Sequence, residues 1–313
     1  MAAKKKSGKG TKSTGGMKRP GIVLLLVVAL LCGIFLLLEQ VKSRYIPGEG
    51  EKPPVTEKHR LPPRTDLKGY EQRPYTSMMV APPAKKARKK LVGHGSLAII
   101  VDDMGGNLQE AKELLSIDLP ITFSIIPGLP KVKAVAEAAH AKGQQVMIHM
   151  PMEPQGYPAQ RMEKNGLLLN YSDDEIVHRL REYAEANPLA VGANNHMGSR
   201  FTENEPKMRT VLALLKEKGL FFVDSRTSPH SVGFALAEKM GLETGARNVF
   251  LDNVQEVAAI KTQLDEAVRI ASRRGSAIAI CHPHQTTIRA LREAMPELHQ
   301  AGITFVHASE LVK

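Results

Sequence analysis

The sequence contains no tryptophan, and aromatic residues make up only 4% of its 313 residues. Because proteins that bind single-stranded nucleic acid stack bases on aromatic side chains, this scarcity disfavours such a role. Only two cysteines are present, Cys32 and Cys281, too few for a disulfide scaffold or an array of zinc fingers. The sequence also lacks the segments G-x-G-x-x-G and G-x-x-x-x-G-K-[ST], which disfavours a dinucleotide or P-loop nucleotide site.

An excess of positive charge is missing from the last two thirds of the chain. Residues 1–95 hold 20 Lys and Arg against 6 Asp and Glu, whereas residues 96–313 hold 23 against 26. The formal net charge of +11 therefore describes a basic leader followed by a weakly acidic folded part. We expect no nucleic-acid partner, since the charge balance of the folded part does not steer a polyanion toward it.

The first 38 residues contain no Asp or Glu. Residues 1–19 are a flexible basic tail, and Gly21 to Leu38 are 18 residues without a charge. At a rise of ~1.5 Å per residue, a helix of that length nearly spans a hydrocarbon core of ~30 Å. The sequence therefore predicts a transmembrane anchor at 20–38. The alternative is a cleaved signal peptide, whose apolar region is typically ~7–15 residues long.

The charges that flank the apolar segment set its expected orientation. Seven Lys and Arg precede it, and only Lys42 and Arg44 follow it closely. By the positive-inside rule, the N-terminus lies in the cytoplasm and residues 39–313 lie outside. This predicts a single-pass protein of the bacterial inner membrane, with its folded domain in the periplasm or at the cell exterior. Residues 39–95 are rich in proline and charge, which predicts an extended, disordered linker.

Short apolar runs alternate with amphipathic stretches from residue 96 to the end of the chain. The expected strands are 97–101, 121–126, 145–148, 190–193, 220–223, 246–251, 277–280 and 303–306. The expected helices are 107–115, 132–141, 172–187, 204–218, 231–240, 255–273 and 286–299. This alternation indicates parallel βαβ units, so residues 96–313 form an α/β domain that is either a (β/α) barrel or a doubly wound sheet.

Polar side chains gather where these strands end. They are Asp102 and Asp103 after the first strand, His149 and Glu153 after the third, Asn194, Asn195 and His196 at the fourth, Asp224, Ser225 and Arg226 at the fifth, Asp252 and Asn253 at the sixth, and His282 and His284 after the seventh. Chemistry in a parallel barrel takes place at the carboxyl ends of its strands. Carboxylates and imidazoles are ligands for Zn²⁺ and similar ions, so the pattern predicts a polar, metal-dependent active site.

The adjacent carboxylates of Asp102 and Asp103 suit two different chemical roles. Neighbouring residues on an ideal strand point to opposite faces, but at a strand end, where the chain turns, both carboxylates can reach one site. One can then bind a metal while the other acts as a base, and a histidine from another strand can serve as general acid. For Asp103, the N-cap of the following helix is the alternative role.

Five segments of the folded part resemble a known family. They are IIVDDMG at 99–105, KGQQVMIHMPMEP at 142–154, VGANNHMGSRFT at 191–202, FFVDSRTS at 221–228 and AIAICHPHQTT at 277–287. In this order they look like the divergent polysaccharide deacetylase family (its YibQ-like group), a remote branch of the NodB-type carbohydrate esterases. The resemblance covers roughly residues 95–313. It implies a distorted (β/α) barrel of the glycoside hydrolase/deacetylase type that carries a metal-dependent deacetylase-like site.

The resemblance also implies roles for individual residues. In NodB-type enzymes an Asp-Asp pair ends the first strand, with the first Asp as base and the second on the metal, and Asp102 and Asp103 match it. His149 matches the first histidine of their metal motif H-[ST]-x-x-H. Met150 and Glu153 stand in place of the Ser/Thr and the second histidine of that motif.

His196 has no counterpart in those motifs, and we expect it to supply the missing imidazole. Two imidazoles and a carboxylate form a usual open zinc set, so Zn²⁺ is the expected metal. The R-P-P-Y segment of the superfamily is absent, but Ile280-Cys281-His282 echoes its late Leu-x-His motif, which implies that His282 is the general acid. The expected substrate contacts are Glu153, Asn195, Asp224, Arg226 and His284. For Asp224 and Arg226 a structural ion pair is the alternative.

Two functions follow from these expectations. The first is a membrane-anchored, metal-dependent hydrolase that removes acetyl groups from a carbohydrate polymer of the cell envelope. The second is a catalytically degenerate domain whose strand ends bind envelope glycan or protein. Metal binding that depends on Asp103, His149 and His196 favours the first, whereas partner binding without hydrolysis favours the second.

Overall fold

A computed structural model of the protein describes residues 94–313. The expected basic tail at 1–19, the anchor at 20–38 and all but the end of the linker at 39–95 lie outside the described residues and stay predictions. Within the part that is described, no helix combines the length and the apolar character needed to cross a bilayer.

The described residues alternate between strands and helices. The strands are β1 (Ser96–Met104), β2 (Thr122–Ile125), β3 (Gln145–Met152), β4 (Gly192–Met197), β5 (Phe221–Asp224), β6 (Thr244–Ala246), β7 (Val249–Phe250), β8 (Ser276–Cys281) and β9 (Thr304–Val306). The helices are α2 (Leu108–Leu114), α3 (Val132–Ala141), α4 (Asp173–Ala186), α5 (Glu205–Glu217), α6 (Gly233–Lys239), α7 (Val257–Arg274) and α8 (Gln285–Gln300), with short 3-10 helices at Phe201–Glu203 and Ala308–Glu310. Each expected helix, and each expected strand except 246–251, coincides with an observed one to within a few residues.

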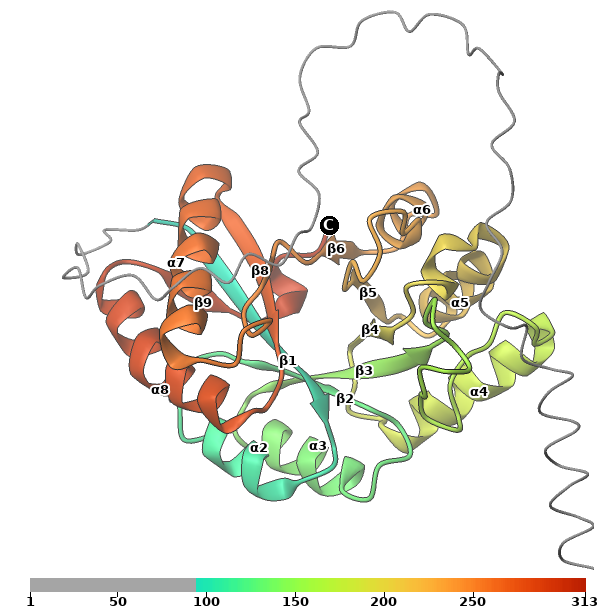
Figure 1. Ribbon diagram of the computed structural model, residues 1–313, viewed down its shortest axis with the longest axis horizontal. Helices are drawn as coiled ribbons and strands as arrows, with labels where there is room; N and C mark the ends of the chain where they lie inside the picture. The colour runs from blue at the N-terminus through green and yellow to red at the C-terminus, as the bar shows by residue number, and fades with distance from the viewer. Residues whose placement is uncertain (1–93) are drawn as a thin grey trace, which may run out of the picture. The chain divides into compact units, whose positions relative to one another are not determined.

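The strands form one curled parallel sheet. Its order is β6-β5-β4-β3-β2-β1-β8-β7, and β9 pairs with the beginning of β1. Helices lie along the outer side of the sheet (Figure 1). The parallel α/β fold expected from the sequence is confirmed, and its sheet is a curled half-barrel rather than a ring of eight regular strands.

The chain changes strand partners at the open edge of this sheet. The sequence predicts a single strand at 246–251, but the structure has β6 pairing with β5 and β7 pairing with β8. Between them, the N–H of Arg247 donates to the carbonyl of Asp224 at 3.0 Å, and the N–H of Asn248 donates to that of Ile278 at 2.9 Å. Because residues 244–250 pair first with β5 and then with β8, they cannot form one continuous strand, and the predicted strand is split into β6 and β7.

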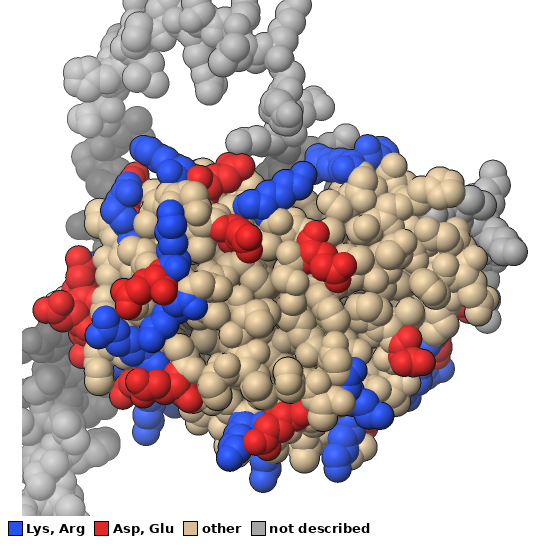
Figure 2. All heavy atoms as spheres, turned by 180° about the vertical axis from the view of Figure 1, so that it is seen from behind, with Lys and Arg blue, Asp and Glu red and all other residues tan. Residues whose placement is uncertain are grey.

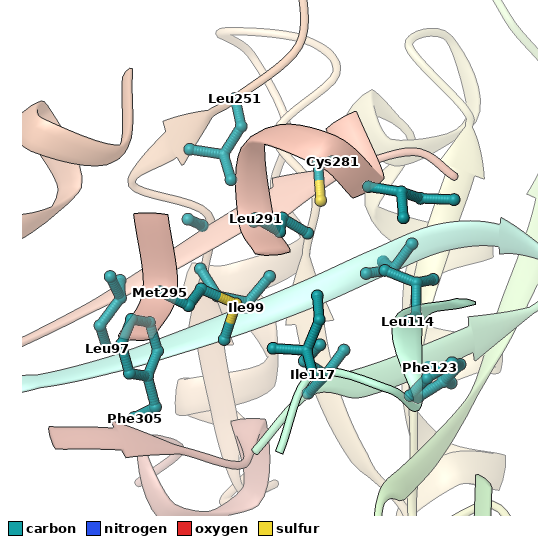
Figure 3. Close-up of a cluster of buried hydrophobic side chains, with 14 of the residues drawn as sticks. Leu97, Ile99, Leu114, Ile117, Phe123, Leu251, Cys281, Leu291, Met295 and Phe305 are labelled. Carbon is teal, nitrogen blue, oxygen red and sulfur yellow. The ribbon is translucent and has the colours of Figure 1, made fainter. Parts of the chain in front are cut away.

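Alternate residues of each strand face opposite layers, as the pleat requires. Leu97, Ile99 and Val101 of β1 face the helices, where they join a large apolar cluster with residues of α2, α7 and α8 (Figure 3). Ala98 and Ile100 face the inside of the curl, where they pack with residues of β3, β5 and β8. Inward-facing positions therefore have even numbers on β1, and this alternation decides which polar side chains meet beyond the apolar layer.

Besides β1, which continues to Met104, two strands extend further than the sequence predicts. β3 continues to Met152 and β4 to Met197, in parallel register, so that His149 lies opposite Asn194 and Pro151 opposite His196. The polar residues expected after these strands therefore lie within them. Their backbone groups are paired in the ladder, and their side chains pair with one another, so burial leaves few of their polar groups without a partner.

The surface of the described residues has no large field of one charge on the face that Figure 2 shows. Lys and Arg alternate with Asp and Glu around the margin of that face, and the broad area between them carries neither. This mixture agrees with the balance of 23 basic against 26 acidic residues in 96–313.

Candidate functional site

A β-bulge brings the two adjacent carboxylates to the same side of β1. Between Val101 and Met104 this strand holds one residue more than β2, and Asp103 takes a positive φ of 56°. A non-glycine residue in that region is uncommon and is found most often where function requires it. As a result, His149 Nε2 lies 3.5 Å from an oxygen of Asp102 and 3.2 Å from one of Asp103.

Three side-chain atoms from three strands converge beside this bulge. Asp103 Oδ1 lies 2.8 Å from His196 Nδ1 and 3.2 Å from His149 Nε2, and the two nitrogens are 3.1 Å apart. Asp103 Oδ1 is buried and has no hydrogen-bond partner. A buried acceptor that faces two imidazole nitrogens is the donor set of a three-ligand metal site. The residues present therefore fit a zinc-like ion, held by Asp103, His149 and His196.

A buried amide fixes the orientation of His149. Asn194 is fully buried, and its Oδ1 lies 2.8 Å from His149 Nδ1 and accepts from the hydroxyl of Ser124 at 2.6 Å. Its Nδ2 donates to Asp102 Oδ1 at 2.9 Å and to the hydroxyl of Ser225 at 3.1 Å. These partners define which end of the amide is oxygen, so His149 donates its Nδ1–H to Asn194 and directs Nε2 toward the converging atoms of Asp103 and His196.

Burial and neighbouring charge act differently on the two carboxyl groups. Burial raises the pKa of Asp102 above its ordinary range, and the nearby His149 only partly offsets this effect. Burial also acts to raise the pKa of Asp103, but the imidazoles of His149 and His196, which lie within 3.2 Å of its carboxylate, outweigh burial and lower that pKa. Asp102 is therefore the better proton acceptor, and Asp103 remains the anion that faces the two imidazoles.

A second Asp–His pair lies on the β8 side of the site. Asp252 accepts the backbone N–H of His282 at 2.7 Å and the hydroxyl of Thr287 at 2.9 Å, and its Oδ1 lies 3.2 Å from His282 Nδ1. The other ring nitrogen, His282 Nε2, points to Asp103 Oδ2 at 3.8 Å. Burial acts to lower the pKa of His282, but the hydrogen bond that its Nδ1–H donates to Asp252 and the nearby acidic charges outweigh burial and raise that pKa. The Asp252–His282 pair therefore favours a protonated His282 whose Nε2–H faces Asp103.

Residues 99–312 match the protein family described as divergent polysaccharide deacetylase. The chain belongs to this family. It is 37% identical over 239 residues to the uncharacterized protein YibQ of Escherichia coli K12, covering 76% of this chain and 74% of that protein. An uncharacterized protein of Haemophilus influenzae is 37% identical over 202 residues, which are 64% of this chain and 71% of that protein.

A solved structure has a similar fold. The crystal structure of the uncharacterized protein ATU2773 from Agrobacterium tumefaciens C58 superposes with a TM-score of 0.67 at 26% identity. The superposition covers 74% of this chain and 92% of that chain. Together with the family match, it confirms the resemblance to the divergent polysaccharide deacetylases that the five sequence segments carry.

This member of the divergent polysaccharide deacetylases places Asn195 and Asp224 away from the converging atoms. Both occupy outward-facing positions of their strands, on the side of Ala193 and Phe222, which pack toward the helices. Asn195 donates to the carbonyl of Met197 at 2.8 Å and accepts the N–H of Ser225 at 2.9 Å. These bonds join the ends of β4 and β5, so the contacts of Asn195 are structural.

Asp224 and Arg226 form a turn rather than a side-chain ion pair. Asp224 Oδ1 accepts the backbone N–H of Arg226 at 2.8 Å. Asp224 Oδ2 accepts from the hydroxyl of Ser231 at 2.8 Å and the N–H of Phe234 at 3.0 Å, where α6 begins. The guanidinium of Arg226 lies over the ring of Phe234, 5.8 Å from its centre. The backbone bond replaces the ion pair considered from the sequence, and Arg226 remains exposed.

Glu153 has local partners, and the helix cap considered for Asp103 is another residue. Glu153 is buried and receives the guanidinium of Arg200 at 2.7 Å and the N–H of Leu169 at 2.8 Å, so its carboxylate holds the segment between β3 and α4. The N-cap of α2 is Asn107, whose side chain accepts the N–H of Gln109 at 2.9 Å. Asn107 therefore takes the capping role that was the alternative for Asp103.

His284 lies at the margin of the site. It is the N-cap residue of α8, its Nε2 is 2.9 Å from Gln255 Nε2, and its ring centre is 5.8 Å from that of His282. Asp252, His282 and His284 form a second group with the spacing of metal ligands. Since both oxygens of Asp252 already have partners in His282 and Thr287, this group is a hydrogen-bonded support for His282.

Three residues of the site were given no individual role from the sequence. Asn194 and Asp252 were placed among the polar residues at the strand ends, and the signal for a role is their position, since each stands beside a predicted site residue in the chain or in the sheet. The third, Glu163, lies in the segment between β3 and α4, with its Oε2 3.4 Å from His196 Nε2. No sequence pattern marks Glu163, because its approach depends on how that long segment folds back over β4.

Proposed function

We propose that the protein is a metal-dependent deacetylase that hydrolyses N-acetyl groups of a carbohydrate polymer of the cell envelope. The observation that carries this proposal is the convergence of Asp103 Oδ1, His149 Nε2 and His196 Nδ1 within 3.2 Å of one another. A buried carboxylate and an Asp-supported imidazole flank these atoms on either side. Membership of the divergent polysaccharide deacetylase family supports the choice of substrate class.

The three converging residues would hold the ion, and Zn²⁺ suits two imidazoles and a carboxylate with an open position. When bound, such an ion polarises a carbonyl and lowers the pKa of water. Asn194 holds His149 in the tautomer that offers Nε2. The low pKa of Asp103 keeps its carboxylate ionised, which is the form that a metal ligand requires.

Asp102 and His282 then divide the proton transfers. Asp102 accepts a proton from the water whose oxygen attacks the acetyl carbon, and its pKa, raised by burial, favours that role near neutral pH. His282 donates its Nε2 proton to the leaving nitrogen as the C–N bond breaks, so the products are acetate and a free amine. Asp252 keeps His282 protonated until this step and holds its ring in the same orientation throughout.

Metal content tests the site directly. The full chain, purified without a His tag, is expected to contain about one equivalent of zinc or another transition metal by elemental analysis. His149→Ala and His196→Ala are expected to lose it. His178→Ala is the matched control, because that histidine is 67% exposed on α4, where its Nε2 lies 3.4 Å from Glu182. Wild-type protein that takes up no metal after reconstitution would overturn the proposal.

Acetate release tests the reaction. Wild-type protein loaded with metal is offered N-acetylated glycan oligomers and purified cell-wall polymer, and acetate is assayed, with Asp102→Asn as the inactive control. Release that needs both the metal and Asp102 supports the proposal. Metal uptake without release from any acetylated glycan, together with retained glycan binding by Asp102→Asn, would instead establish the binding-domain function.

The site of action is part of the proposal. The uncharged segment 21–38 and the basic residues before it favour a protein held in the inner membrane with residues 39–313 on the outer side. Cell fractionation and protease treatment of spheroplasts test this. Digestion of the folded domain only after the inner membrane is broken would contradict the orientation.

A further inference from the structure

Two buried polar atoms without hydrogen-bond partners face each other at the edge of the proposed metal site. They are Glu163 Oε2 and His196 Nε2, and they are 3.4 Å apart. Leaving a buried acceptor or donor unpaired is costly, so two such atoms side by side indicate a contact that is completed in the working protein. Hydrogen bonds of active sites are often long until the ligand is bound.

The segment that carries Glu163 is fastened on its C-terminal side. The N–H of Gly166 donates to the carbonyl of Glu163 at 3.0 Å, which closes a turn. Asn165 donates from Nδ2 to the carbonyl of Pro127 at 2.8 Å, and its own carbonyl accepts the hydroxyl of Tyr183. Contacts to the loop after β2 and to α4 thus hold the carboxylate over His196, so its placement does not depend on a freely moving loop.

The other imidazoles of the site follow one rule. His149 has Asn194 Oδ1 on Nδ1 and points Nε2 to the centre, and His282 has Asp252 on Nδ1 and points Nε2 inward. In each ring the nitrogen that faces away from the centre meets an acceptor, which decides the tautomer. His196 is reversed, since its Nδ1 lies among the converging atoms and its Nε2 faces outward.

We propose that Glu163 is the positioning residue of His196. Its carboxylate accepts the Nε2–H of His196, which leaves the lone pair of Nδ1 for the ion and fixes the ring in the plane that serves it. The proposal rests on the metal site proposed above and adds to it a residue that is not itself a ligand. It also explains why a segment between β3 and α4 is held against the centre at all.

Metal affinity of the full chain is the first test. Glu163→Ala removes the acceptor, whereas Glu163→Gln keeps a neutral one, and Glu137→Gln removes an equal charge from an exposed position on α3. By competition with a chelator, Glu163→Ala is expected to bind Zn²⁺ about 10–100-fold more weakly than wild type, the usual loss when such a partner is removed. Glu163→Gln should recover most of the affinity, and Glu137→Gln should match wild type.

The Nε2–H of His196 is the second test. In NMR of ¹⁵N-histidine-labelled, Zn²⁺-loaded protein, in which the ion takes Nδ1, this proton is expected to be protected from exchange with water in the wild type and in Glu163→Gln, but to exchange rapidly in Glu163→Ala. Unchanged affinity and unchanged protection in Glu163→Ala would overturn the inference. Wild-type protein that binds no metal would overturn the proposed function instead, so the two failures are distinguishable.

Discussion

The ends of β1 and β5 each carry an aspartate, and the two differ in what their oxygens contact. Asp224, the last residue of β5, is buried and accepts three bonds from Arg226, Ser231 and Phe234, all from the loop and helix that follow it. Asp103, near the end of β1, is partly exposed, but its Oδ1 is buried and has no hydrogen-bond partner, while two imidazole nitrogens face it. The carboxylate of Asp224 stabilises the loop that follows it. The carboxylate of Asp103 keeps an oxygen available for a ligand that is not part of the chain.

The comparison teaches that residue type and strand-end position do not by themselves mark a site. Both aspartates satisfy those criteria in the sequence. The distinguishing property is leftover bonding capacity in a buried group, because a fold rarely leaves a buried acceptor unsatisfied without a ligand or a catalytic reason. The predictions below test this difference, beginning with the largest effect.

Replacing Asp102 should abolish catalysis without loss of the bound metal. Asp102→Asn keeps the size of the side chain but cannot accept the proton, so kcat for acetate release is expected to fall about 10²–10⁴-fold. Metal content, measured on the same protein, should equal that of the wild type, because Asp103 and the two histidines remain. Loss of metal together with activity would show that Asp102 is a ligand and not the base.

Replacing Asp224 should lower the stability of the fold and leave the metal site intact. Asp224→Ala leaves the buried N–H of Phe234 and its neighbours without an acceptor, so the free energy of unfolding is expected to fall by about 1–3 kcal/mol. In thermal unfolding this lowers Tm by about 2–4 °C per kcal/mol for a domain of this size. Metal content should not change. A variant with normal Tm but no metal would remove the distinction between the two strand ends.

The Asp252–His282 pair should control the alkaline side of the pH profile. Asp252 holds the pKa of His282 above its ordinary value, and a protonated His282 is the form that donates to the leaving nitrogen. Asp252→Asn removes the negative partner, so the pKa of His282 falls and the acid is lost at lower pH. The falling limb of kcat/KM is expected to move down by about one pH unit. An unmoved limb would exclude His282 as the general acid.

The smallest effect is expected at His284. Although Asp252, His282 and His284 have the spacing of metal ligands, His284→Ala should leave the metal content at the wild-type value, because the oxygens of Asp252 are already engaged. Elemental analysis checks this. A fall in metal content from two equivalents in the wild type to one in His284→Ala would reveal a second metal site. It would show that Asp252, His282 and His284 do more than support His282 by hydrogen bonds.

Much of the fold was predictable from the sequence because its signals are local. Apolar runs that end in polar residues located the strands, and the amphipathic stretches between them located the helices, such as 255–273 for α7. The extra length of β3 and β4 was not predictable, since it comes from pairing between them. The split of 246–251 likewise depends on two edges that the sequence does not show to be neighbours.

The candidate site was predictable in part, and the pleat explains which part. Positions that share the inward face with Ile100, Met147, Val223 and Ile280 lead to Asp102, His149, Ser225 and His282, whereas Asn195 and Asp224 fall on the outward face. Strict alternation applied to the sequence would therefore have separated the two sets. It would also have placed Asp103 outward, and only the bulge at its positive φ of 56° brings that residue back.

The sequence by itself determined the alternation of strands and helices, the family, and the carboxylates and imidazoles available at the strand ends. Each of these depends on residue types at short spacings, which the chain specifies locally. Tertiary structure alone decided which of those groups keep an unpaired atom, and that Glu163 reaches His196 from a segment that follows another strand. The physical reason is that hydrogen-bond satisfaction is a property of neighbours in space, and the parallel sheet chooses those neighbours from far apart in the chain.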